Sequence, residues 1–213
     1  MSQEQARRIF EALVRRGLAK EILERFFRED SCINSTRVLA DVFRRMGVEA
    51  VAASVRVRIF SPRFVERAGR EGSLPREPEE LRAWTRQPGV WSVGIGYGSI
   101  DLPRDKWPGH LVLRAAGSCL IDATISQASR PQYEMKLPHM MLVRGAPEAF
   151  WRAEELLSAD INGCLAAYES KPRDTSYLGS PAWAGRSHIE GAAADAICAR
   201  LRTACAGWRP MGP

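Results

Sequence analysis

The sequence contains no apolar run of membrane-spanning length, and no apolar signal region follows residues 1–8. We therefore expect a cytoplasmic protein that has no membrane partner. The sequence also lacks a Cys-x-x-Cys pair, and its histidines, His110, His139 and His188, show no short ligand spacing. Because structural zinc sites depend on such spacings, we expect no metal site.

Lysine is scarce, and the chain carries only Lys20, Lys106, Lys136 and Lys171. The net charge of +6 therefore comes almost entirely from arginines, which are spread along the sequence rather than clustered. Arg56 and Arg58 alternate with apolar residues, a pattern typical of the solvent face of a half-buried strand. We favour a solvated arginine-rich surface over a nucleic-acid interface, and keep an arginine-rich nucleic-acid accessory protein as an alternative.

The cysteines are few and irregularly spaced. An odd count of five argues against a disulfide framework in a cytoplasmic protein. We expect most of them to be reduced residues of the core. The five are Cys32, Cys119, Cys164, Cys198 and Cys205.

Cys32 stands at the start of a predicted helix over 32–46. Apolar residues recur at three- and four-residue spacing between Val38 and Met46, which makes one buried stripe. Asp30 or Ser31 can cap the N-terminus of this helix. The first turn of a helix has unpaired backbone N–H groups, which lower a thiol pKa and can bind an oxyanion. Cys32 is therefore a candidate nucleophile.

His110 begins one apolar run, and Asp122 ends the next. The runs are joined by Ala115-Ala116-Gly117, a short turn whose glycine can take a positive φ. A hairpin that pivots at Ala116 pairs His110 with Asp122 on one face, with Cβ atoms about 5 Å apart. Asp122 can then bind one ring nitrogen and leave the other for the thiol. A one-residue slip would separate the two side chains, so the prediction depends on the register.

Each of these residues also has an ordinary structural role. A lone cysteine in an apolar helix is usually a small core residue, and an aspartate at a strand end is usually a turn residue. The three together, in the order nucleophile, base and orienting carboxylate, favour a catalytic site of Cys32, His110 and Asp122. Trp107 precedes the histidine strand, and it is a candidate wall of a substrate cleft or an ordinary partly buried tryptophan.

The expected fold class is α+β, with helices packed on a mostly antiparallel sheet, because strands dominate the middle of the chain and helices its ends. A polar stretch rich in proline, glycine and glutamate, at about 61–89, is predicted to be an insertion outside the core. We expect a main domain over 1–170 and a C-terminal helical appendage over 171–213. The other predicted elements are helices within 3–27, near 79–85 and over 189–203, strands over 48–60, 90–97 and 140–144, and hairpins over 110–124 and, around Asn162-Gly163, 154–168.

Over roughly residues 30–125 the chain resembles the transglutaminase-like superfamily, whose broader relatives in mechanism are papain-type proteases and arylamine N-acetyltransferases. The resemblance implies a transglutaminase-like or papain-like core in which Cys32 is the nucleophile, His110 the base and Asp122 the residue that orients the imidazole. The matching segments are Ser31-Cys32-Ile33, Gly109-His110-Leu111-Val112 and Leu120-Ile121-Asp122-Ala123-Thr124.

The sequence thus predicts a cysteine-dependent acyl-transfer enzyme, either an amide or peptide hydrolase or a transglutaminase-like transferase. Its substrate would be a peptide, amide or thioester, and the chemistry needs no cofactor. The alternative from another class is a non-catalytic binding module on the same fold. That alternative is supported by Leu111 and Val112 after the histidine, and Ser31 and Ile33 beside the cysteine, where many superfamily members carry aromatic residues.

Overall fold

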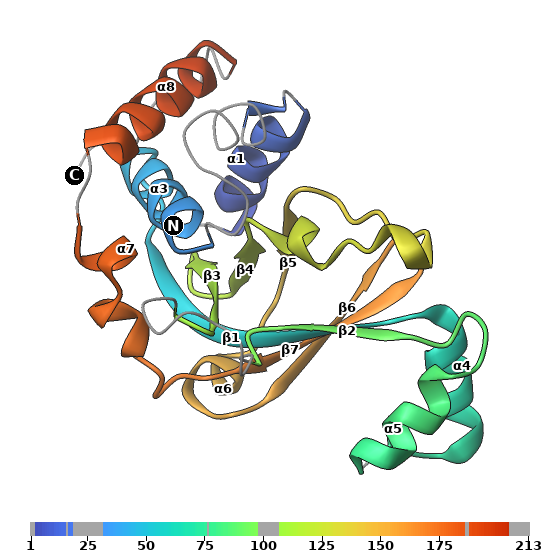
Figure 1. The fold of residues 1–213 in the computed structure, drawn as a ribbon. Coiled ribbons are helices and arrows are strands. Elements are labelled where there is room, and N and C mark those ends of the chain that lie inside the picture. The colour runs from blue at the N-terminus through green and yellow to red at the C-terminus, as the bar shows by residue number, and fades with distance from the viewer. Residues whose placement is uncertain are drawn as a thin grey trace.

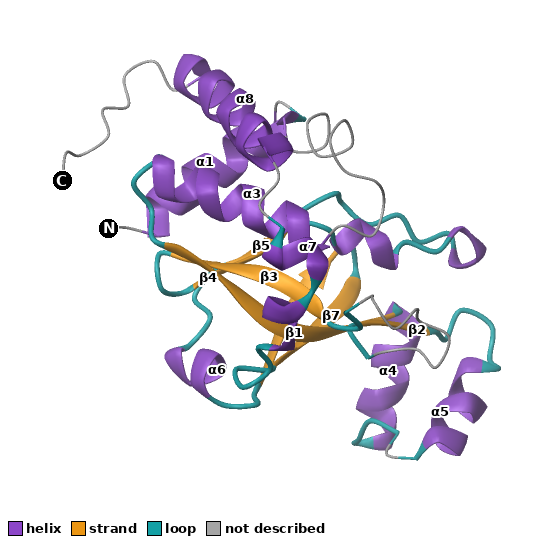
Figure 2. Cartoon of the chain, turned by 60° about the vertical axis from the view of Figure 1, so that its left-hand side comes forward, coloured by secondary structure: helices purple, strands orange, loops and turns teal. Residues whose placement is uncertain are grey.

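The computed structural model describes residues 3–15, 17–18, 32–75, 77–97, 107–185 and 188–204. Three long helices gather on one side of a curved sheet, while two shorter helices stand apart from it (Figures 1 and 2). Within these ranges no helix is long and apolar enough to cross a membrane. The helices are α1 (Gln3–Arg15), α3 (Cys32–Arg45), α4 (Pro62–Glu71), α5 (Pro78–Thr85), α6 (Glu148–Arg152), α7 (Pro181–Ala184) and α8 (His188–Ala204), with 3-10 turns η1 (Ile125–Ala128), η2 (Pro131–Tyr133) and η3 (Ser176–Gly179).

The sheet is antiparallel throughout, in the order β5-β4-β3-β1-β7-β6, and β2 also pairs with β1. This confirms the α+β class with an antiparallel sheet. One edge of β1 pairs first with β3 and then with β2, so these two strands lie end to end along it. Its seven strands are β1 (Ala50–Phe60), β2 (Ser92–Ile95), β3 (His110–Ala115), β4 (Cys119–Asp122), β5 (Met141–Val143), β6 (Leu156–Ile161) and β7 (Cys164–Ser170).

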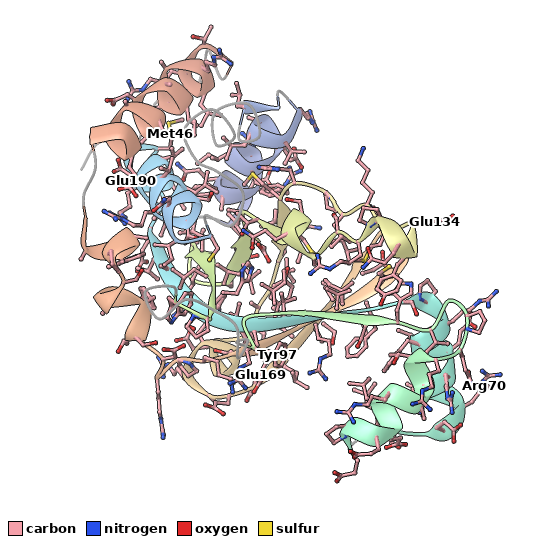
Figure 3. The ribbon with its side chains drawn as sticks, in the orientation of Figure 1. Met46, Arg70, Tyr97, Glu134, Glu169 and Glu190 are labelled. Carbon is pink, nitrogen blue, oxygen red and sulfur yellow. The ribbon has the colours of Figure 1, made fainter. Side chains whose placement is uncertain are left out.

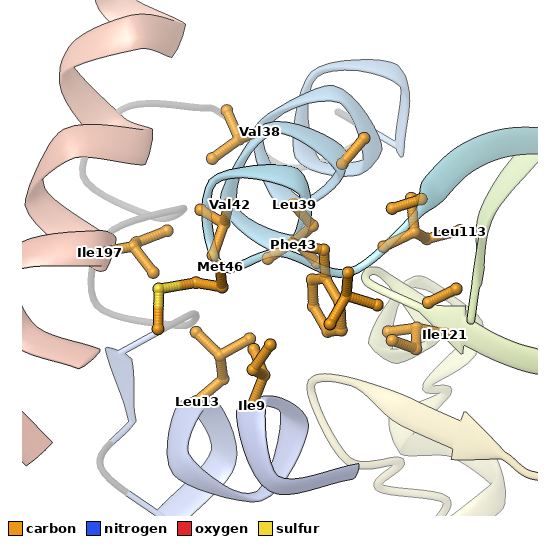
Figure 4. Close-up of a cluster of buried hydrophobic side chains, with 14 of the residues drawn as sticks. Ile9, Leu13, Val38, Leu39, Val42, Phe43, Met46, Leu113, Ile121 and Ile197 are labelled. Atoms are coloured by element: carbon orange, nitrogen blue, oxygen red, sulfur yellow. The ribbon is translucent and has the colours of Figure 1, made fainter. Parts of the chain in front are cut away.

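One face of the sheet is covered by α1, α3 and α8. The apolar stripe of α3 packs between Leu113 and Ile121 of the sheet and Ile9 and Leu13 of α1 (Figure 4). Ile197 of α8 closes the same cluster, so the C-terminal helix is part of the main core. The predicted domain boundary after residue 170 stays a prediction.

The other face of the sheet encloses a second apolar cluster. Val143 at one edge of the sheet and Ile161 at the other both belong to it, which shows that the sheet curls toward a barrel. Val112, Leu120 and Tyr168 of the central strands point into the same cluster. Strands β3 and β4 are therefore buried on both faces, which explains their nearly continuous apolar sequences.

The polar insertion contains two helices rather than the one predicted near 79–85. The helix α4 was missed, although Ser61 accepts a hydrogen bond from the Phe64 backbone N–H and Pro62 occupies the first helical position. Phe64 and Trp84 pack together in a small cluster of their own. Figure 3 shows Arg70 in this helical pair, away from the curved sheet.

Most other predicted elements are confirmed within a few residues at their ends. The helix over 32–46, the strand over 48–60 and the last helix all appear. The Asn162-Gly163 turn joins β6 to β7, and both of its residues have positive φ, as a type I′ turn requires. The proposed helix caps Asp30 and Ser31, and residues 19–27 of the predicted N-terminal helices, lie outside the described residues.

Candidate active site

Cys32 is the first residue of α3 and is half-buried. One turn further along, the hydroxyl of Thr36 donates to the Leu111 carbonyl oxygen at 3.2 Å. Leu111 directly follows His110 in β3, and a helical turn advances only about 5.4 Å. The bond from Thr36 therefore fixes the start of α3 beside the start of β3.

His110 is the first residue of β3 and is completely buried. It pairs with Val55 of β1, and the last residue of β2 pairs with Val57 two positions away. The imidazole thus lies where the edge of β1 changes partner from β3 to β2. At such a strand end the histidine has strand neighbours on both sides, while the backbone pairing is interrupted next to it.

Gly96 lies against the backbone of His110. A Cβ added to Gly96 would come within 2.9 Å of the Val55 carbonyl oxygen and 3.1 Å of the His110 Cβ, and the residue has φ +82°. Only glycine fits here, so Gly96 helps to set the position of the histidine.

Asp122 is the last residue of β4 and accepts a hydrogen bond from His110. Its Oδ2 lies 2.9 Å from His110 Nε2, and both side chains are completely buried. The predicted contact between the imidazole and this carboxylate is therefore present. His110 Nδ1 is also buried and makes no hydrogen bond with any residue that the structure describes.

The predicted register of the hairpin is wrong by two residues. The structure pairs Ala115 with Cys119 and Leu113 with Ile121, so the turn is centred on Gly117 instead of Ala116. Both Ala116 and Gly117 have positive φ, and the turn is as long as the predicted one but begins one residue later. His110 and Asp122 are consequently diagonal neighbours rather than directly opposed ones. Long side chains can bridge that diagonal, and a shift of two residues leaves both on the same face.

Two further groups donate to the same carboxylate, and the sequence did not predict either. The hydroxyl of Tyr168 lies 3.1 Å from Asp122 Oδ2, and the backbone N–H of Thr124 lies 3.0 Å from Oδ1. Tyr168 is completely buried on β7, on the far side of β1 from β3. The sequence indicates only that Tyr168 faces inward, because it occupies an inward position in the alternating pattern of β7 after the Asn162-Gly163 turn.

The electrostatics of the buried pair favour a charged imidazole. Burial by itself lowers the pKa of His110, but the charge and hydrogen bond of Asp122 outweigh it and raise the pKa to about 10. The neighbouring thiol of Cys32 adds to this rise. Nδ1 has no aligned hydrogen-bond partner among the described residues, so the thiol and the ring are neighbours without a well-aligned hydrogen bond.

The other described cysteines have a different environment. Cys119, Cys164 and Cys198 are buried and reduced, and burial raises the pKa of each thiol. Cys205 lies outside the described residues. Among the four cysteines that the structure describes, Cys32 is thus the most accessible and the one that adjoins an imidazole.

Trp107 is half-buried and its indole packs closely against Gly109, the residue before His110. A Cβ on Gly109 would lie 2.0 Å from the ring. The indole N–H donates to the Ser176 hydroxyl at 2.9 Å, and the ring meets Tyr177 edge-on. Its role as a substrate wall stays a prediction.

Comparison with protein-family models, with curated proteins and with solved structures found no match to this chain. Within the described ranges, no group of three or more histidine, cysteine, aspartate or glutamate side chains is arranged to hold a metal ion. The chemical role of the site must therefore be argued from its own geometry.

Proposed function

We propose that this protein is a cysteine-dependent acyl-transfer enzyme in which Cys32, His110 and Asp122 form the catalytic triad. The observation that carries the proposal is the buried imidazole, which is held by Asp122 through Nε2 and leaves Nδ1 free beside the Cys32 thiol. A histidine with only a structural role would be expected to satisfy both nitrogens when it is fully buried. The unpaired nitrogen next to a thiol is the arrangement that nucleophile activation requires.

In the first half-reaction, the Cys32 thiolate, whose proton is held on Nδ1 of the charged His110, attacks the carbonyl carbon of an amide or thioester. The carbonyl oxygen becomes an oxyanion, which the backbone N–H groups at the start of α3 can stabilise. The bond to the leaving group then breaks, and the imidazolium gives its proton to the departing amine or thiol. The product is a thioester between the acyl group and Cys32.

In the second half-reaction, water or an amine attacks the thioester. Nδ1, which is neutral after the first half-reaction, removes a proton from this acceptor, the Cys32 sulfur leaves as a thiolate beside the imidazolium, and the acyl group departs as an acid or a new amide. Asp122 does not take the proton in either step. It keeps Nε2–H as the donor and stabilises the imidazolium that forms.

The same arrangement supports a transglutaminase-like core as the finer description of the fold. A helix that begins at the nucleophile, followed by antiparallel strands that carry the histidine and the aspartate, is the order on which the sequence resemblance rests. The resemblance leaves hydrolysis and transfer open, and we propose a peptide, an amide or a thioester as the acyl donor.

The test is alkylation by iodoacetamide at mildly acidic pH, followed by peptide mass spectrometry of all cysteines. We expect Cys32 to react at least about tenfold faster than Cys119, Cys164 and Cys198, because its thiolate is stabilised by the imidazolium. His110→Ala should remove most of this advantage.

The matched control is His139→Ala, which removes an imidazole elsewhere in the chain and should leave the Cys32 rate unchanged. Equal labelling of all cysteines, or a Cys32 rate that is insensitive to His110→Ala, would refute the proposed function. Those outcomes would favour a non-catalytic binding module instead.

A further inference from the structure

Tyr168 is connected to the candidate site through the carboxylate of Asp122. Its hydroxyl lies 3.1 Å from Oδ2, the same oxygen that accepts the hydrogen bond from His110 Nε2 at 2.9 Å. The three side chains come from β7, β4 and β3, so they join strands on both sides of β1. All three are completely buried.

A buried carboxylate is costly unless hydrogen-bond donors surround it. Among the described residues Asp122 has three donors, with Thr124 N–H on Oδ1 and both Tyr168 and His110 on Oδ2. The Thr124 contact fixes one oxygen from the backbone next to Asp122 itself. Tyr168 supplies the only side-chain hydroxyl among the described donors to this carboxylate, and it approaches from another strand. Together these donors leave the carboxylate little freedom to rotate away from the imidazole.

Tyr168 also remains protonated over the range in which the site would work. Burial raises the pKa of its phenol, and the neighbouring charge of Asp122 raises it further. The hydroxyl therefore stays a donor. Its other contact is the Met141 sulfur at 3.7 Å, a weak acceptor that does not compete with a carboxylate for the proton.

We propose that Tyr168 is a positioning residue of the active site, whose hydroxyl holds Asp122 Oδ2 so that His110 presents Nδ1 to Cys32. The inference rests on the proposed function. Tyr168 does not touch the reacting atoms and acts through Asp122 alone. Its hydroxyl also weakens the interaction between Asp122 and the imidazolium, because an oxygen that accepts two hydrogen bonds is a weaker partner than one that accepts a single bond.

The test is Tyr168→Phe, which keeps the ring and removes the hydroxyl. We expect the Cys32 alkylation rate near neutral pH to fall by about tenfold, because Asp122, while still bonded to His110, no longer holds Nδ1 at a fixed position beside Cys32. We also expect the titration midpoint of the His110 imidazole, followed by NMR, to rise by about half a pH unit or more, because Oδ2 then serves the imidazolium alone. A purely structural role would change stability without moving this midpoint.

The matched control is Tyr133→Phe, which removes a phenol hydroxyl from a ring that stacks on Trp91 instead of bonding Asp122. It should reproduce the unmodified protein in both measurements. If Tyr168→Phe does not fold, replacement of the tyrosines by 3-fluorotyrosine serves as the second measurement. A more acidic phenol is a stronger donor, so the His110 midpoint should then move down.

The outcomes separate the inference from the proposed function. If Asp122→Asn slows Cys32 alkylation but Tyr168→Phe leaves the rate and the His110 midpoint unchanged, the triad stands and the role of Tyr168 is refuted. A fall of the midpoint in Tyr168→Phe, or no shift with fluorotyrosine, would also refute it. If Asp122→Asn and His110→Ala both leave Cys32 unaffected, the proposed function itself fails.

Discussion

Replacing Asp122 by asparagine should change how the stability of the protein depends on pH. Asparagine has nearly the shape of aspartate but no charge, and it offers one acceptor oxygen in place of two. If that oxygen stays on the Thr124 N–H, the amide NH2 faces His110 Nε2 and competes with its proton. The imidazole then prefers the tautomer with the proton on Nδ1, which points at Cys32 and cannot accept the thiol proton.

The magnitude follows from the pKa of His110, which the folded protein raises from 6.5 to about 10. A group whose pKa is raised on folding stabilises the folded state fully below its unfolded pKa, and loses that contribution as the pH rises through its folded pKa. The contribution of His110 is thus complete below about pH 6.5 and lost toward pH 10. At about 1.4 kcal/mol per pKa unit the ceiling is about 5 kcal/mol, and we expect a loss on the order of 2–4 kcal/mol.

Asp122→Asn should remove this dependence. Without the carboxylate, burial lowers the pKa of His110, so the ring is neutral between pH 6.5 and 10 and the stability changes little there. The variant should instead lose stability as the pH falls below about 6.5, when the unfolded chain takes up a proton that the folded one does not. The sign of the change in the free energy of unfolding with pH, in each of these pH ranges, therefore distinguishes Asp122→Asn from the unmodified protein.

Urea unfolding at a series of pH values from 5 to about 10.5 measures this difference. The matched control is Asp174→Asn, which removes a half-buried carboxylate whose pKa is lowered in the folded state, against the opposing effect of burial, by hydrogen bonds from Ser176 and Ser54. Its contribution is lost only at acidic pH, so the control should keep the alkaline loss of the unmodified protein. Parallel curves for the unmodified protein and Asp122→Asn would refute the assignment of a charged pair.

Two further substitutions test how the backbone places the site. Gly96→Ala should cost about 2–4 kcal/mol in urea unfolding and slow Cys32 alkylation, because the new Cβ meets the His110 backbone. Gly117→Ala, at a positive φ with open space around it, should cost only about 1 kcal/mol and leave alkylation unchanged. Thr36→Val should cost about 1 kcal/mol and lower the alkylation rate several-fold, because the start of α3 loses its bond to β3. An equal rate in Thr36→Val and the unmodified protein would show that this bond does not set the position of Cys32.

The elements that carry the site could be predicted because local patterns determine them. The three- and four-residue spacing of the apolar residues after Cys32 fits a helix and not a strand, and α3 begins at that cysteine. The Asn162-Gly163 turn likewise has one common conformation between strands. The helix α4 was also marked, by Ser61 and Pro62, but the polar composition of the insertion hid it because only one face of that helix meets other residues.

The hairpin register could not be predicted, for a different reason. Both β3 and β4 are buried on both faces, so their apolar residues fit equally well in more than one register. The turn sets the register, because Ala116 and Gly117 both adopt positive φ and the centre of the turn moves by one position. A non-glycine residue adopts that conformation only when the surrounding structure favours it, and a short sequence pattern does not contain this information.

The contact of His110 with Asp122 was nevertheless predicted, although the register was not, and the burial of polar groups explains why. A register error of two residues preserves the face on which each side chain lies, whereas an error of one would bury two polar groups in separate apolar clusters. The folding chain faces the same constraint, because an isolated buried imidazole and an isolated buried carboxylate are each costly. Face is thus fixed by the need to pair these groups, and only the position along the strand is left to the turn. The contact of Tyr168 with Asp122 could not be predicted in the same way. It joins β7 to β4, which are not neighbours in the sheet, and nothing in the local sequence of β7 indicates that its side chains lie near β4.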